Sequence, residues 1–122
     1  MIERDFILRQ AAQLARALAA VLAQQRGGDV AGAQAALADG LDAALGLRLD
    51  ALRAMGRAEV EALVTEDGLA SAEKAVALAD LLREDAEPAG RVRARWLYEL
   101  AVRVGGPVPF DVQARIDALP DA

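Results

Sequence analysis

The sequence predicts an all-α fold in which antiparallel helical hairpins form an array of about six or seven helices. Two observations lead to this prediction. Apolar residues recur at intervals of three and four along most of the chain, which is the period of an amphipathic helix. Aromatic residues, which strands favour, make up only 3% of the chain, and no useful length alternates apolar with polar residues, so we expect no sheet. A chain of 122 residues has room for a single domain, residues 1–122.

Residues 1–26 are predicted to form one long N-terminal helix. Its apolar stripe consists of Ile7, Ala11, Leu14, Leu18 and Val21. The helix is expected to end at Gly27-Gly28, because glycine adopts the left-handed C-cap conformation without steric penalty.

A second helix is predicted over residues 30–45, with Asp29 as its N-cap and Gly46 after its end. Its apolar positions are Ala33, Leu37, Leu41 and Leu45. Gly40 lies inside this helix, where glycine costs about 1 kcal/mol relative to alanine. We therefore expect Gly40 to allow close contact with a neighbouring helix.

The middle of the chain is predicted to contain two short helices within residues 47–65, separated at Gly56. Glu66-Asp67-Gly68 is a turn signal. A longer helix is expected over residues 69–85. Its inward face would consist of Leu69, Ala72, Val76, Ala79 and Leu82.

A loop is predicted at residues 87–90, because Pro88 disfavours helix in the residue before it. A helix then runs over 91–104, with a buried face of Trp96, Leu97, Leu100 and Val104. Gly105-Gly106-Pro107 ends it. Asp111 is expected to cap a short C-terminal helix within residues 110–119.

Two stretches share a pattern of small, large and small residues at spacings of four and three. The first is Gly28-Asp29-Val30 with Ala33, Leu37, Gly40 and Leu41, and the second is Leu69, Ala72, Val76 and Ala79. The pattern resembles the second helix of a tetratricopeptide repeat, in which small residues let paired helices approach. The spacing from Ala33 to Ala72 is 39 residues, against about 34 in that family, and the first-helix signature is missing. The resemblance covers residues 28–104 and implies a right-handed array of helical hairpins.

The opening segment, Met1-Ile2-Glu3-Arg4-Asp5-Phe6-Ile7-Leu8-Arg9-Gln10, resembles the start of short uncharacterised bacterial proteins with tetratricopeptide-like folds. That resemblance implies a helical scaffold without an assigned activity. The arginine and alanine bias of the chain favours a bacterial source.

Composition excludes several classes of function. The chain has no cysteine and no histidine, which removes thiolate chemistry and the commonest general base and metal ligand. The net charge of −5 disfavours binding to phosphate backbones, so we expect no nucleic-acid partner. No signal peptide is evident, and Arg9 and Arg16 interrupt the apolar residues of the first helix. We therefore expect a cytoplasmic protein with no membrane partner, no enzymatic activity and no cofactor.

The acidic segment between residues 59 and 87 suggests an alternative function. Asp80 and Glu84 are one helical turn apart and could share a hard cation such as Mg²⁺ or Mn²⁺. An enzyme or regulator that depends on carboxylates is therefore the second hypothesis. A solvated acidic face is the simpler interpretation of such a run.

The helix over residues 91–104 supplies further candidate residues. Arg91 and Arg95 share one face, where they could pair with acidic residues or line a small-ligand groove between helices, which is the third hypothesis. Tyr98 is a candidate interface residue, because tyrosine is enriched at binding hot spots, but a place in the core or on an ordinary surface is the simpler interpretation.

The favoured hypothesis is a module that binds a protein or peptide. The first helix carries apolar residues away from its main stripe, namely Ile2, Phe6, Leu8 and Leu22. A monomer of this size need not cover them all, so the sequence also predicts homodimerisation through the N-terminal helix.

Overall fold

The structure, a computed structural model, describes residues 2–121, and the side chains of residues 4–121. Within this part of the chain there are seven helices and one β-hairpin, whose two strands have two residues each. The helical content confirms the all-α prediction. The elements in order are α1 (Ile2–Arg26), α2 (Val30–Leu45), α3 (Leu49–Arg53), α4 (Arg57–Ala62), β1 (Thr65–Glu66), β2 (Leu69–Ala70), α5 (Ala72–Leu82), α6 (Pro88–Arg103) and α7 (Val112–Asp117).

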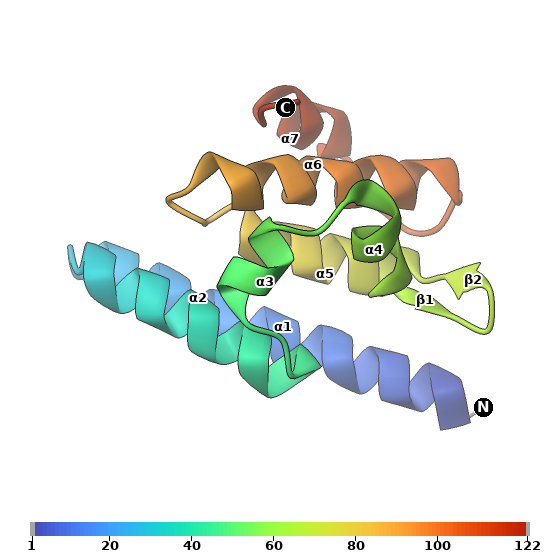
Figure 1. Ribbon diagram of the computed structural model, residues 1–122. Helices are drawn as coiled ribbons and strands as arrows, with labels where there is room; N and C mark the ends of the chain where they lie inside the picture. The colour runs from blue at the N-terminus through green and yellow to red at the C-terminus, as the bar shows by residue number, and fades with distance from the viewer. Residues whose placement is uncertain (1, 122) are drawn as a thin grey trace.

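Two antiparallel helix pairs make up most of the molecule (Figure 1). Helices α1 and α2 form the first pair, α5 and α6 form the second, and α1 packs against α5 to join them. Helices α3 and α4 connect the pairs and contact α6, while α7 lies on the outer side of α6. The N-terminal end of α1, the β1–β2 hairpin and the C-terminal end of α6 lie on the same side of the molecule (Figure 1).

The first helix pair follows the sequence prediction closely. Asp29 caps α2 by accepting a hydrogen bond from the Gly32 backbone N–H at 2.8 Å. Gly46 ends the helix in the left-handed conformation, with φ of 63°. A Cβ atom at Gly40 would overlap the Cβ of Ala17 on α1. The expected close contact is therefore present, and it lies between α1 and α2.

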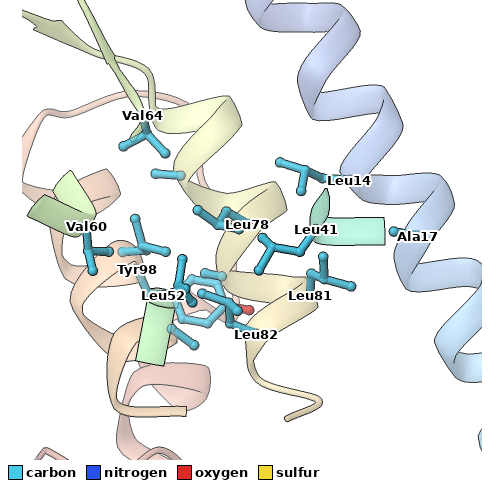
Figure 2. Close-up of a cluster of buried hydrophobic side chains, with 14 of the residues drawn as sticks. Leu14, Ala17, Leu41, Leu52, Val60, Val64, Leu78, Leu81, Leu82 and Tyr98 are labelled. Carbon is cyan, nitrogen blue, oxygen red and sulfur yellow. The ribbon is translucent and has the colours of Figure 1, made fainter. Parts of the chain in front are cut away.

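Helix α5 lies at the centre of the core. Buried leucine and alanine side chains occupy most of its surface, because α1 covers one side and α6 the other. Figure 2 shows Leu78, Leu81 and Leu82 of this helix between Leu14 of α1 and Tyr98 of α6. Ser71 caps the start of α5, accepting a hydrogen bond from the Lys74 backbone N–H at 3.1 Å.

The expectation of no strand is wrong for one short segment. Asp67 and Gly68 both have positive φ, 52° and 79°, and form the two-residue turn of a hairpin in which Glu66 pairs with Leu69. An Asp-Gly pair favours this turn because both central residues must adopt left-handed conformations. The hairpin delays the start of α5 to Ala72, and Leu69 is 75% exposed rather than inward-facing.

Helix α6 begins at Pro88, earlier than the predicted residue 91. Proline is well suited to the first helical position, where its missing N–H would have no helical partner in any case. The predicted buried face is also partly wrong: Leu97 and Leu100 are buried, Trp96 is half-buried and Val104 is exposed. The guanidinium of Arg93 covers the Trp96 ring at 4.8 Å from its centroid.

One helix in the described residues, spanning Arg4–Arg26, is long and apolar enough to cross a membrane by length and composition. By this criterion Arg9 and Arg16 leave the helix apolar enough for a membrane-spanning length. The core helix of a soluble protein and a signal sequence meet the same criterion, and here α1 packs against α2 and α5.

Candidate functional site

Asp80 and Glu84, the candidate metal ligands, are directed to different partners. Asp80 accepts hydrogen bonds from the Tyr98 hydroxyl and from the Arg115 guanidinium, the latter at 2.7 Å. Glu84 accepts a hydrogen bond from the Gln25 amide at 3.0 Å. Among the described residues, no group of three or more acidic side chains lies close enough together to hold a metal ion. Asp80 therefore links α5 to α6 and α7, and Glu84 links the loop after α5 to α1.

Tyr98 is fully buried, which agrees with the core interpretation and removes Tyr98 from the candidate interface residues. Helix α6 is covered by α5, α4 and α7, which leaves little of its surface for solvent. Burial raises the pKa of the Tyr98 phenol above its ordinary value, and the Asp80 carboxylate raises it further. The hydroxyl thus acts as a neutral donor inside the fold.

Arg91 and Arg95 are half-buried and bond within the fold. Arg91 donates to the backbone carbonyls of Asp85 and Ala86, both at 3.3 Å. Arg95 donates to the carbonyl of Leu119 at 2.9 Å and contacts Glu99 at 3.4 Å. Both side chains hold turns and chain ends in place, so the sequence overestimated their availability to a ligand.

The apolar candidates on α1 differ in exposure. Phe6 is 44% exposed and Leu8 is 40% exposed, whereas Leu22 is half-buried. The side chain of Ile2 lies outside the described ones. The exposed pair lies in the N-terminal part of α1 and does not line the groove described next.

An open groove with a volume of about 380 Å³ lies where three distant segments meet. Arg4 and Ile7 line it from α1, the hairpin and the start of α5 line a second side, and Val104 with Pro107 lines the third. Gly106 keeps this last segment close, because a Cβ atom there would overlap the Cβ of Ala72. The groove is therefore a product of tertiary packing.

The groove combines apolar and acidic side chains. Leu69 and Val104 are 75% and 43% exposed, so large apolar side chains reach solvent on two of its sides. Three acids, Glu66, Asp67 and Glu73, line it beside one base, Arg4, which lies 3.9 Å from Glu73. The charge of these four side chains sums to −2, and the long Arg4–Glu73 pair neutralises the rim only in part.

Phe110 extends this apolar character along the loop that follows α6. Its side chain is fully exposed, and Val108 is 36% exposed. Exposed apolar residues scattered singly are ordinary, whereas several in one region mark an interaction surface. The sequence reasoning missed all of these residues, because it assigned Val104 and Leu69 to the core and did not consider the loop.

Two buried charged residues were also missed. Lys74, the only lysine in the chain, is 3% exposed, and its ammonium group donates to the Gln10 side chain of α1. Burial lowers the pKa of Lys74 below its ordinary value. The one signal available in the sequence was the use of lysine where every other base is arginine.

Asp85, in the loop between α5 and α6, is 2% exposed. Its carboxylate accepts two hydrogen bonds from Arg53 of α3, at 2.9 Å and 2.6 Å, and one from the Glu87 backbone N–H at 3.0 Å. The hydrogen bonds to the Asp85 carboxylate raise the pKa of the Arg53 guanidinium. When the Gln34 amide of α2 is oriented so that its nitrogen faces Asp85 and its oxygen faces the Ala86 N–H, the nitrogen donates to Asp85 at 3.2 Å. The cluster joins α2, α3 and the α5–α6 loop and is structural.

Comparisons of the chain with protein-family models, with curated protein sequences and with solved structures gave no significant match.

Proposed function

We propose that this protein is a non-catalytic module that binds a protein or peptide in the groove between α1, the β-hairpin and the end of α6. The observation that carries the proposal is the exposure of Leu69 and Val104 on the sides of that groove. Burying a leucine or valine side chain contributes about 1.5–3 kcal/mol, which makes such residues natural anchors for a partner.

The proposal includes a tetratricopeptide-like arrangement of the hairpins. It is supported by two consecutive antiparallel helix pairs and by the Gly40–Ala17 contact, which follows the small-residue pattern of the resemblance. We further propose that the partner is a cytoplasmic protein of the bacterium that produces this chain. The absence of histidine and cysteine supports a binding role over a catalytic one.

Capture experiments with matched variants test the binding surface. Wild-type protein, L69Q and V104Q are immobilised and exposed to an extract of the source organism, and retained proteins are identified by mass spectrometry. V30Q is the control, because Val30 is 71% exposed at the other end of the molecule. We expect a partner that wild type and V30Q retain and that L69Q and V104Q lose. Identical retention by all four proteins would contradict the proposal.

Self-association is a second candidate, supported by the exposure of Phe6 and Leu8 on α1. Sedimentation equilibrium over a wide concentration range measures it directly. A dimer that dissociates in F6Q/L8Q supports contact through the N-terminal helix. A monomeric mass at every concentration removes this candidate and leaves the groove proposal unaffected.

A further inference from the structure

The open edge of strand β2 lies along the same groove. Ser71 donates its backbone N–H to the Val64 carbonyl at 2.8 Å, and Glu66 pairs with Leu69. In an antiparallel hairpin, alternate residues direct their backbone groups to the partner strand and to the opposite edge. The N–H and C=O of Ala70, which lies between these two pairs, therefore point away from β1. Ala70 also lines the groove.

Among the described residues, Ala70 has no backbone hydrogen bond outside the hairpin. An unpaired edge beside an apolar groove is the arrangement in which an extended peptide adds a strand, with main-chain bonds for affinity and side-chain pockets for specificity. The strand is short, so Ala70 would supply the central pair of bonds. Leu69 and Val104 would contact the apolar side chains of the peptide.

Charge decides between a foreign peptide and a second copy of this chain. The groove carries Glu66, Asp67 and Glu73 against Arg4, and the whole chain has a net charge of −5. A second copy would bring more negative charge to an acidic rim, whereas a basic segment would be attracted to it. The occupant that fits is an extended peptide in which apolar residues alternate with lysine or arginine.

We infer that the groove recruits its partner through an extended, basic and apolar segment that pairs with the open edge of β2. This inference rests on the proposed function and adds the chemistry of the partner to it. Asp67, Glu73 and the backbone of Ala70 then become specificity-determining elements.

Selection from a random dodecapeptide library displayed on phage tests the inference without knowledge of the natural partner. We expect enriched peptides that alternate apolar and basic residues. On titration, their amide shift changes should map to residues 66–73 and 104–107. Enrichment of acidic or neutral peptides, or shifts on another face, would overturn the inference.

Two variants then separate charge from backbone pairing. D67N/E73Q should weaken binding of an enriched peptide about three- to tenfold, because exposed ion pairs contribute little each. The control D39N/D42N, which removes two exposed acids of α2, should leave it unchanged. Asp67 tolerates asparagine because asparagine also adopts positive φ readily. Equal weakening by both double variants would show that only the net charge matters.

A70P removes the edge N–H and should weaken binding about tenfold, the effect of one lost hydrogen bond. Should A70P fail to fold, a peptide N-methylated at alternate residues makes the same test on wild-type protein. Unchanged binding of the methylated peptide overturns strand addition. Groove-binding peptides that are helical or uncharged would overturn this inference alone, while the extract capture decides the proposed function separately.

Discussion

Removing the carboxylate of Asp85 is expected to destabilise the fold through the buried Arg53 pair. Truncating one partner of a buried ion pair costs about 3–5 kcal/mol when the other charge stays buried. The Arg53 side chain is 26% exposed and can turn towards water, whereas the Asp85 side chain is fully buried. We therefore expect D85A to lower the free energy of unfolding by about 2–3 kcal/mol. R53M leaves the buried carboxylate without its charge partner and should lower it by about 3–4 kcal/mol.

Gly90 adds a sharper test of the same cluster. A Cβ atom at Gly90 would overlap the Asp85 carboxylate, so G90A should displace that group from Arg53 and destabilise the protein. In a D85G background the overlap disappears, because this variant removes the Cβ of residue 85 as well as its carboxylate. There G90A should stabilise the protein by about 1 kcal/mol, because alanine favours helix over glycine. The substitution should thus change sign with the residue at position 85.

Urea unfolding followed by circular dichroism and by Trp96 fluorescence measures these free energies. For a domain of this size, the loss expected for D85A corresponds to a fall of about 10 °C in melting temperature. A cost below about 1 kcal/mol for D85A would refute the assignment of a structural ion pair. An equal effect of G90A in both backgrounds would refute the proposed overlap.

Three further predictions concern the core. G40A should cost about 1–2 kcal/mol in urea unfolding, because its methyl overlaps Ala17, and G40A/A17G should recover part of that loss. Since Tyr98 has a raised pKa in the folded state, stability should be retained below pH 10 and fall by about 1.4 kcal/mol per pH unit above it. Y98F should remove that alkaline loss, and an unchanged profile would contradict the buried phenol–Asp80 bond. Since Lys74 has a lowered pKa in the folded state, wild type should gain stability relative to K74M as the pH rises towards 10.5. A difference that stays constant between pH 7 and 10.5 would show that the Lys74 ammonium group is not desolvated.

The sequence predicted the helices best where their ends carry local signals. Helix α2 matches its predicted residues 30–45 because Asp29 and Gly46 act within one turn of it. The starts of α5 and α6 were missed although the signals were present. Asp67-Gly68 favours a hairpin as well as a loop, and Pro88 suits the first position of a helix as well as the end of one.

Burial was harder to predict than helix position. The period of α6 places Trp96 and Tyr98 on different faces, but it does not say how many faces neighbouring helices cover. In the fold, α5, α4 and α7 surround α6, so Tyr98 became core and Trp96 stayed half-buried. The apolar sides of the groove were assigned to the core for the same reason.

The candidate site could not be predicted at all from local patterns. Its walls come from residues near 4–7, 66–73 and 104–107, which the chain brings together only when α1 packs against α5. The partners of Lys74 and Asp85 are likewise 64 and 32 residues away in sequence. Periodicity describes one element at a time, so such contacts lie beyond it.

The burial of the only lysine has a practical consequence for proteolysis. An endoprotease that cleaves after lysine has one target bond in this chain, at Lys74 within α5. Lys74 lies in the first turn of α5, so exposing that bond requires at least this turn to open and the Lys74 side chain to leave Gln10. Cleavage into two fragments would therefore report how often the start of α5 opens, so a protease and a gel can measure that opening equilibrium under native conditions.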